Sequence, residues 1–268
     1  MNYQHIYHAG NSADVIKHAV LFSVLNSLKK KETPFCFIDT HAGSGSYDLN
    51  STQAMKTGEA KQSGGVLDLL KHQNQNKDKN NKNTESLPEF ISVYLTYVNG
   101  LLSQNNIYPG SPWIADALSR PQDQLILNEL HPEACRLLKR LFKARTNVAI
   151  HQRDAYEFLP AVLPPAKSFN IKRACILIDP PYERTDEAHA VAHALALALE
   201  KFPQGVYLIW EPITSKKPVW RPTPKMASIL KKHPNYKNMD FLTKNSEGLE
   251  GLIGSHLLIL NPPYGAMV

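Results

Sequence analysis

A short apolar segment that ends abruptly at an acidic residue constrains the fold of this chain most strongly. Residues 173–182 read RACILIDPPY, and Ala174 to Ile178 is an unbroken apolar run rich in isoleucine. Such a run is too short for an ordinary helix and is typical of a strand buried on both faces of a parallel sheet. The prolines after Asp179 can neither donate ladder hydrogen bonds nor continue the pairing. Asp179 is therefore predicted at the carboxyl end of a central strand, where open α/β sheets bind ligands.

The tetrapeptide Asp179-Pro180-Pro181-Tyr182 suits chemistry on an exocyclic amine. The lone pair of an amine such as N6 of adenine is delocalised into the ring, so this nitrogen is a poor nucleophile. The Asp179 carboxylate and the Pro180 carbonyl are two acceptors that would engage its N–H groups and free the lone pair. Tyr182 offers a flat face for stacking, worth about 1–3 kcal/mol per base in nucleic-acid complexes. The alternative interpretation is a proline strand terminator beside a chance aspartate.

Length and composition narrow the class of protein. The 268 residues suffice for one large domain or for a domain with an insertion. No apolar run has the length of a membrane span and no signal-peptide pattern is present, so we expect a cytoplasmic protein without a membrane partner. The separated cysteines Cys36, Cys135 and Cys175 fit buried thiols in a reducing compartment.

Charge and histidine content leave the ligand class open. The formal charge of +6 is compatible with a nucleic-acid partner but does not establish one. Eleven histidines occur without a Cys-x-x-Cys or His-Glu-x-x-His pattern, so no metal site is expected.

Strands alternate with helices along most of the chain, which predicts a parallel, doubly wound sheet. Expected strands are 35–39, 124–127, 148–151, 174–178 and 206–210, with a late pair at 239–243 and 256–260. Expected helices are an N-terminal run that ends at residues 29–31, then 113–119, 132–144, 156–163, 188–201 and 226–232.

A glycine loop follows the first strand and favours a nucleoside ligand. Thr40 to Gly45 reads THAGSG, and these glycines allow close backbone approach. The dinucleotide fingerprint requires a third glycine at the position of Asp48, so NAD or FAD is not supported. S-adenosylmethionine, which has no pyrophosphate, remains possible.

Three acidic residues follow strands at a regular interval. Glu129, Asp154 and Asp179 are spaced by 25 residues each, about one helix plus one strand. We assign Glu129 to the ribose hydroxyls, as in other nucleoside-binding sheets, and place Asp154 near the adenine ring. Taken singly, each acid could instead cap a turn or a helix.

Two other regions do not follow this regular spacing of strands and acidic residues. Residues 51–106 are predicted to form an inserted small helical subdomain with a low-complexity loop near 72–86. A second tetrapeptide, Asn261-Pro262-Pro263-Tyr264, also fits the amine-methyltransferase pattern, but it lies outside the 25-residue register and we interpret it as a strand terminator.

Together these motifs closely resemble the RlmJ-type 23S ribosomal RNA adenine-N6 methyltransferase family. The resemblance rests on HAGNSADVIKH, DTHAGSGSYDL, YPGSP, NELHP, RDA and LIDPPYE, in that order, between Tyr3 and Tyr264. It implies a Rossmann-like methyltransferase fold that uses S-adenosylmethionine and modifies 23S ribosomal RNA, and we expect a monomer. Members of the family continue beyond the position of Tyr264, so we expect either a shortened form or the loss of the last strand.

The resemblance also implies site residues. Asp179, Pro180, Tyr182 and Lys17 would be catalytic, and Tyr3 and His5 in an N-terminal arm would meet the substrate. Cofactor contacts would fall on His18, His41, Ser111, Glu129, Asp154, Ala155 and Asp179.

Two rival functions share these residues. One is an adenine-N6 methyltransferase acting on DNA, although no target-recognition domain is evident. The other is a non-catalytic RNA-binding module with a methyltransferase-like fold, which would not require Asp179 and Tyr182.

Overall fold

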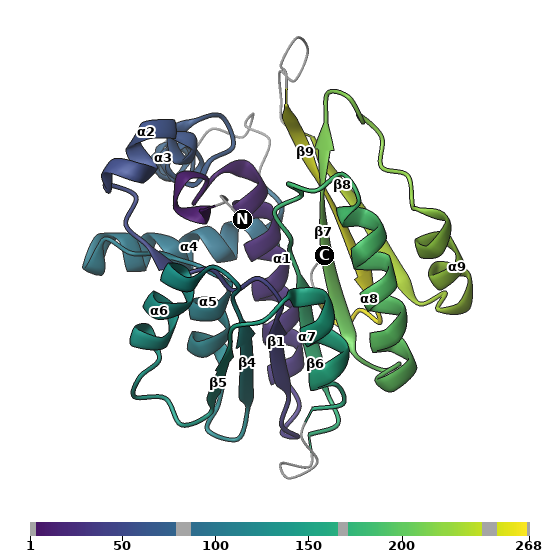
Figure 1. Ribbon diagram of the computed structural model, residues 1–268. Coiled ribbons are helices and arrows are strands. Elements are labelled where there is room, and N and C mark those ends of the chain that lie inside the picture. The colour runs from purple at the N-terminus through teal and green to yellow at the C-terminus, as the bar shows by residue number, and fades with distance from the viewer. Residues whose placement is uncertain (1–3, 79–86, 166–170, 243–250, 267–268) are drawn as a thin grey trace.

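A seven-stranded sheet lies between two layers of helices (Figure 1). The computed structural model describes residues 4–78, 87–165, 171–242 and 251–266. The strands are β1 (Cys36–Asp39), β2 (Ser46–Tyr47), β3 (Tyr108–Pro109), β4 (Gln124–Asn128), β5 (Val148–His151), β6 (Ala174–Ile178), β7 (Val206–Thr214), β8 (Tyr236–Leu242) and β9 (Leu252–Leu260). The helices are η1 (His5–Tyr7), α1 (Ser12–Lys29), α2 (Thr52–Thr57), η2 (Glu59–Lys61), α3 (Val66–Asp78), α4 (Glu89–Asn105), α5 (Ser111–Leu118), α6 (Pro132–Leu141), α7 (Ala155–Val162), α8 (Glu187–Lys201) and α9 (Pro224–Lys232).

The main sheet confirms the predicted doubly wound arrangement. Its strand order is β5-β4-β1-β6-β7-β9-β8, and β2 pairs with β3 in a separate ladder. Strands β1, β4, β5, β6 and β7 pair in parallel, whereas β9 is antiparallel to both neighbours. Strand β9 lies inside the sheet, between β7 and β8. The carboxyl ends of five parallel strands therefore meet at one edge.

Each face of the sheet packs against its own helices. Along β1, Phe37 joins a cluster with residues of α1, α4 and α5, whereas the adjacent Ile38 joins residues of α7, α8 and α9. All five residues of β6 are buried, as expected for a central parallel strand. The apolar run that precedes Asp179 therefore sits in the middle of the molecule.

Helix α1 brings the N-terminal segment to the carboxyl edge of the sheet. Asn11 caps the helix by accepting a hydrogen bond from the Asp14 N–H at 2.9 Å. Val15 and Val24 are fully buried, so the helix is fixed along its length. Neither this helix nor any other in the described ranges is long and apolar enough to cross a membrane.

Helices α2, α3 and α4 lie between β2 and β3 in the chain, and we propose that they form the inserted subdomain. The predicted loop near 72–86 is wrong in its first part, because α3 continues to Asp78. Asn, Gln and Lys disfavour a helix only mildly. In addition, Gln73 Nε2 donates to the Ser92 carbonyl of α4 at 3.2 Å, which docks this turn. Residues 79–86 lie outside the described residues.

The second tetrapeptide lies at the opposite edge of the sheet. Because β9 is antiparallel to β7, its last residue, Leu260, pairs with Tyr207 near the start of β7. The Asn261 side chain donates to the carbonyls of Pro203 and Gly205 at 2.8 Å each. This tetrapeptide therefore ends a strand, as predicted, far from the edge that carries Asp179.

Candidate active site

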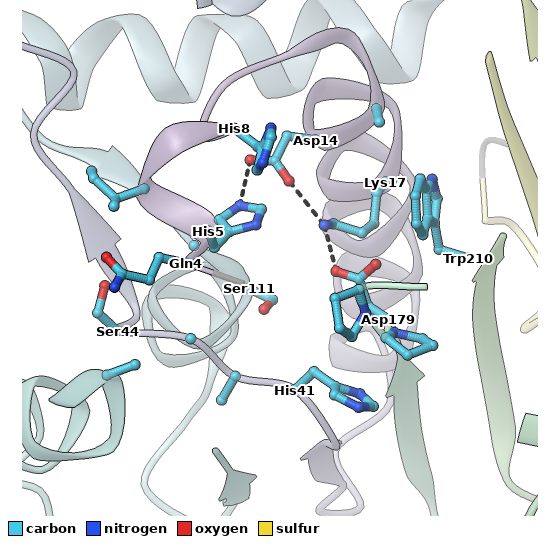
Figure 2. A pocket seen from close by; sticks show the side chains of 18 of the residues that line it. Gln4, His5, His8, Asp14, Lys17, His41, Ser44, Ser111, Asp179 and Trp210 are labelled. Carbon is cyan, nitrogen blue, oxygen red and sulfur yellow. Dashed lines mark hydrogen bonds and ion pairs between the residues drawn. The ribbon is translucent and has the colours of Figure 1, made fainter. Parts of the chain in front are cut away.

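A large cavity lies along the edge where the parallel strands end (Figure 2). Its volume is about 980 Å³, which is at the upper end of the range for small-molecule sites. The segments after β1, β4, β5 and β6 line it, together with η1, the first turns of α1 and the end of β7. Eleven of the predicted site residues line this one cavity: His5, Lys17, His18, His41, Ser111, Glu129, Asp154, Ala155, Asp179, Pro180 and Tyr182. Tyr3 lies outside the described residues.

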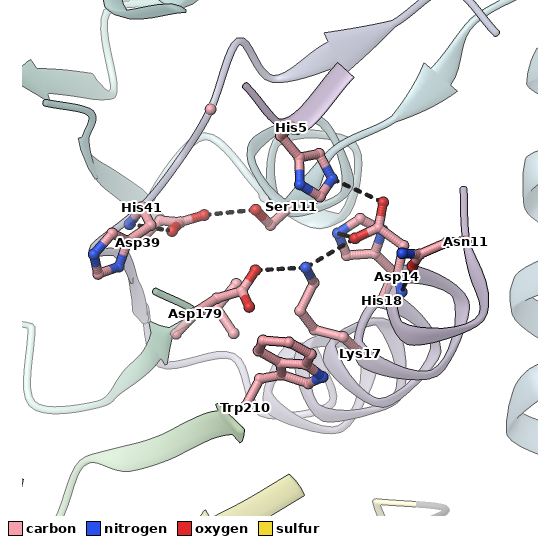
Figure 3. A network of polar contacts seen from close by, with 12 residues as sticks. His5, Asn11, Asp14, Lys17, His18, Asp39, His41, Ser111, Asp179 and Trp210 are labelled. Atoms are coloured by element: carbon pink, nitrogen blue, oxygen red, sulfur yellow. Dashed lines mark hydrogen bonds and ion pairs between the residues drawn. The ribbon is translucent and has the colours of Figure 1, made fainter. Parts of the chain in front are cut away.

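Asp179 belongs to a chain of ion pairs that includes Lys17 and Asp14 (Figure 3). Lys17 Nζ lies 2.5 Å from Asp179 Oδ2 and 2.9 Å from Asp14 Oδ1. Burial by itself would lower the pKa of Lys17, but the two carboxylates overcome it and hold that pKa well above its usual value. Lys17 is therefore a permanent cation beside the candidate acceptor.

Asp14 connects this chain to the N-terminal turn. Its Oδ2 accepts hydrogen bonds from the Gly10 N–H at 3.0 Å and contacts His5 Nε2 at 2.8 Å. Burial would raise the pKa of Asp14, but His5 and Lys17 hold it well below its usual range. The sequence analysis assigned no role in the site to Asp14, although its spacing from Lys17 and His18 places all three on one helix face.

Glu129 and the glycine loop form a second group of contacts. Glu129 Oε2 accepts from the Gly43 N–H at 2.8 Å, and Oε1 accepts from the His131 N–H at 2.7 Å. Each carboxylate oxygen has a second lone pair that can accept from a ligand hydroxyl. Gly43 has φ +61°, and a Cβ there would lie 2.2 Å from the Tyr47 hydroxyl, so glycine is required.

The end of β1 holds a buried carboxyl group that the sequence analysis treated only as a strand end. Asp39 accepts from the Ser111 hydroxyl at 2.7 Å and from the His41 N–H at 3.1 Å. Burial raises the pKa of Asp39 to about 7. Burial lowers the pKa of His41 to about 4, so this imidazole is neutral at neutral pH. Asp39 thus positions both predicted cofactor residues.

Asp154 and His18 also combine a structural role with a place in the cavity. Asp154 Oδ1 caps α7 by accepting from the N–H groups of Tyr156 at 2.9 Å and Glu157 at 3.2 Å. The helix-cap alternative is therefore correct for this residue, which nevertheless lines the cavity. His18 Nδ1 lies 3.2 Å from the Tyr108 hydroxyl, and burial lowers the pKa of His18 to about 3.

Tyr182 adopts an uncommon backbone conformation beside Trp210. Its φ is +52°, which costs a non-glycine residue about 1–3 kcal/mol and is most frequent at functional sites. The Tyr182 hydroxyl donates to the Trp210 carbonyl at 3.1 Å, and the two rings meet edge to face at 5.8 Å. Lys17 Nζ lies 6.0 Å from the Trp210 ring centroid. The sequence analysis did not identify Trp210, which it placed at the end of a strand that continues to Thr214.

Acidic side chains dominate the cavity although the chain as a whole is basic. The formal charge of the chain is +6. The acidic lining residues are Asp14, Asp48, Glu59, Glu129, Glu133, Asp154, Asp179 and Glu187, whereas Lys17 and Arg184 are the lysine and arginine residues among the lining. The interior therefore favours a positively charged small molecule, while the exterior favours an anionic partner.

A family model and several known proteins each match most of this chain. The family model described as "Ribosomal RNA large subunit methyltransferase D, RlmJ" matches residues 32–266. Two relatives named ribosomal RNA large subunit methyltransferase J, from Escherichia coli (strain K12) and Haemophilus influenzae, are each 33% identical over 98% of this chain and 88% of their own length. A crystal structure of a Legionella pneumophila protein aligns with a TM-score of 0.74 and 32% identity, covering 96% of this chain and 88% of that one.

Proposed function

Because this chain belongs to the RlmJ family of ribosomal RNA large subunit methyltransferases, we propose that it transfers a methyl group from S-adenosylmethionine to N6 of one adenine in 23S ribosomal RNA. Membership of the family makes the chain a ribosomal RNA methyltransferase. The choice of N6 is carried by one observation: Asp179 lies at the carboxyl end of β6, inside the cavity that it shares with Glu129 and Gly43. A fixed acceptor at that place suits an amine nucleophile.

The cavity fits S-adenosylmethionine by charge and by its hydrogen-bonding groups. The ammonium and sulfonium groups of this molecule are positive, and the lining is predominantly acidic. The spare lone pairs of Glu129 suit the two ribose hydroxyls. We assign the cofactor contacts to His18, His41, Ser111, Glu129, Asp154, Ala155 and Asp179.

The methyl acceptor is held by Asp179, Pro180 and Tyr182. S-adenosylmethionine, when bound, supplies an electrophilic methyl group on a positively charged sulfur. The target adenine leaves its stack to reach the cavity, as other enzymes that act on a base require. Its two N–H hydrogens are donated to the Asp179 carboxylate and the Pro180 carbonyl, while its ring stacks on Tyr182. With both N–H groups engaged, the N6 lone pair is directed at the methyl carbon.

Lys17 supports this step through Asp179. Bound S-adenosylmethionine would give its methyl carbon to N6, and the electron pair of the broken carbon–sulfur bond would stay on sulfur. N6 then carries positive charge until it releases a proton. Because Lys17 contacts Asp179 Oδ2, it orients the carboxylate, which stabilises that charge and accepts the departing proton on its way to solvent.

The N-terminal turn completes the substrate side of the site. We assign Tyr3 and His5 to substrate contacts. His5 already contacts Asp14, which contacts Lys17, so a base that touches His5 would be coupled to Asp179 through three successive polar contacts. We further propose that the enzyme acts as a cytoplasmic monomer, and that its substrate is protein-free RNA, because a base leaves its stack more readily before the ribosomal subunit packs around it.

Labelled methyl transfer tests this proposal. Unmodified, protein-free 23S RNA and duplex DNA would be incubated separately with the protein and labelled S-adenosylmethionine. We expect label in the RNA alone, and label in DNA alone would overturn the substrate assignment. Absence of label in both would favour the non-catalytic binding module.

A further inference from the structure

The interval between Glu211 and Asp240, which includes the connection between β7 and β8, carries the net positive charge of this molecule. No Asp or Glu occurs between Glu211 and Asp240. The basic residues of this interval are Lys216, Lys217, Arg221, Lys225, Lys231, Lys232 and Lys237. The remainder of the chain then holds 23 Lys and Arg residues against 24 Asp and Glu residues. The net charge of the protein is therefore concentrated in one interval.

Residues 215–225, which we call the basic strap, begin at the rim of the cavity. Pro212 and Thr214 line the cavity just before the strap starts. The Lys217 N–H donates to the Thr214 carbonyl at 2.9 Å, and the Ser215 N–H donates to the Gly251 carbonyl at 2.9 Å. These bonds hold Lys216 and Lys217 beside the cavity mouth. In Figure 1 the strap descends from the top of β7 along the outer side of the molecule to α9.

An aromatic stack anchors the middle of the basic strap. The Trp220 ring lies parallel to the His256 ring, with centroids 3.8 Å apart and an interplanar angle of 9°. His256 is buried on β9, and its Nδ1 contacts Asp240 Oδ1 on β8 at 2.5 Å. The strap is therefore attached to β7, where it begins, and through Trp220 to β9, which His256 links to β8. These contacts fix the course of the strap along the molecule.

The cations of the basic strap are exposed, and the part of the chain that the structure describes places no acidic side chain in an ion pair with them. Lys216, Lys217, Arg221 and Lys225 are all exposed. Within the described ranges, none of these four forms an ion pair with an acidic side chain. On the other side of the molecule, by contrast, Arg136 pairs with Glu133 at 2.6 Å and Arg145 with Asp116 at 2.7 Å. The strap therefore keeps its charge available for an external anion.

We propose that the basic strap binds the phosphate backbone of the substrate RNA beside the target adenine, an inference that rests on the proposed function. Lysine and arginine side chains bind phosphates with release of counterions and without regard to base sequence. The strap starts next to Thr214 at the cavity rim, so a strand lying along it would present an extruded base to Asp179. The cavity selects the base, and the strap holds the strand that carries it.

A matched pair of variants tests this assignment. The strap variant K216Q/R221Q/K225Q removes three charges, and Lys217 is left unchanged because its charge acts on the largely buried Glu211. The control variant K29Q/K30Q/K31Q removes three charges at the far end of α1, at the opposite edge of the sheet. A third variant, K216R/K225R, keeps the charge. Affinity for in vitro transcribed 23S RNA would be measured across a range of salt concentrations, with thermal unfolding as a check on folding.

The strap variant should bind RNA about tenfold or more weakly than the wild type near 0.15 M salt. The slope of the logarithm of its association constant against the logarithm of the salt concentration should fall in magnitude by roughly 2, since each phosphate contact contributes about 0.7 in single strands. The control variant and K216R/K225R should match the wild type in RNA affinity and in salt slope. The turnover number of the strap variant at saturating RNA should equal that of the wild type. Equal affinities and slopes in the strap and control variants, with an active wild type, would overturn the strap and leave the proposed function intact. A wild type that methylates no RNA would overturn both.

Discussion

Lys17 Nζ lies 2.5 Å from Asp179 Oδ2, although the two residues are 162 positions apart in the sequence. This contact joins the first helix to the strand that carries the candidate acceptor. Because Asp14 holds the same ammonium at 2.9 Å, the N-terminal turn, α1 and β6 form one electrostatic unit. The candidate site is therefore assembled only when the chain is folded around the centre of the sheet.

Removal of the Lys17 charge should damage both stability and activity. Lys17→Met would leave two carboxylates facing each other with no cation between them, and the loss of one partner of a buried pair costs about 3–5 kcal/mol. The double variant Asp14→Asn/Lys17→Met should regain part of this stability but no activity. Urea unfolding and methyl transfer measure the two effects. An active, fully stable Lys17→Met protein would contradict the proposed role.

Glu129→Gln should weaken cofactor binding selectively. The carboxylate is assigned to the ribose hydroxyls, and hydrogen bonds to a charged group contribute about 1.5–3 kcal/mol, so the dissociation constant of S-adenosylmethionine should rise about 10- to 100-fold. RNA affinity should not change. Glu157→Gln, an exposed position on α7 outside the cavity lining, is the matched control. Calorimetric titration of both variants with S-adenosylmethionine measures this effect. Equal affinities of Glu129→Gln and Glu157→Gln for S-adenosylmethionine would exclude Glu129 as a ribose ligand.

Substitutions of Tyr182 should separate the roles of its ring and its backbone. Tyr182→Ala and Tyr182→Gly both remove the stacking face and should lose activity to the same extent. Since φ at this position is +52°, the glycine variant should be about 1–2 kcal/mol more stable than the alanine variant. Tyr182→Phe keeps the ring and should retain most activity. Equal stability of the alanine and glycine variants would show that the left-handed conformation is not maintained in solution.

Glu211 should make stability fall as the pH rises through neutrality. Burial raises the pKa of Glu211 to about 7, so the folded state binds its proton more tightly than the unfolded state. The resulting stability is complete below the unfolded pKa, about 4.3, and is lost as pH rises through 7. Relative to wild type, Glu211→Gln should therefore gain up to about 3 kcal/mol between pH 4 and pH 8. Urea unfolding at both values measures this difference, and a constant difference would refute the pKa shift.

The sequence was sufficient to locate strands whose ends are chemically marked. β5 and β6 have the predicted bounds, because an apolar run stops at a polar or proline-bearing turn in each case. The regular interval between Glu129, Asp154 and Asp179 correctly indicated that all three follow strands. The sequence could not show that β1 lies between β4 and β6, which places the glycine loop between Glu129 and Asp179.

Features that depend on contacts between distant segments escaped the sequence analysis. β7 was expected to end at Trp210 but continues to Thr214, because β9 pairs with it over that whole length. The role of Asp14 depends on the docking of α1 against β6. The first part of the Asn/Lys-rich tract is helical because α4 lies beside it. In each case a contact with a distant segment, rather than the conformational preference of the local sequence, determined the secondary structure or the role of the residue.

Nucleoside analysis of 23S RNA shows whether the protein methylates N6 of adenine and whether Asp179 is needed for it. Unmodified RNA would be incubated with S-adenosylmethionine and either wild-type protein or Asp179→Asn, which preserves the size of the side chain but not its charge. We expect N6-methyladenosine with the wild type and none with the variant. The variant should stay folded, because Lys17 keeps its contact with Asp14, but its thermal unfolding midpoint should lie below that of the wild type, because the ion pair between Lys17 and Asp179 is lost. A folded Asp179→Asn protein that forms N6-methyladenosine at the wild-type rate, or a wild type that methylates another base, would contradict these expectations.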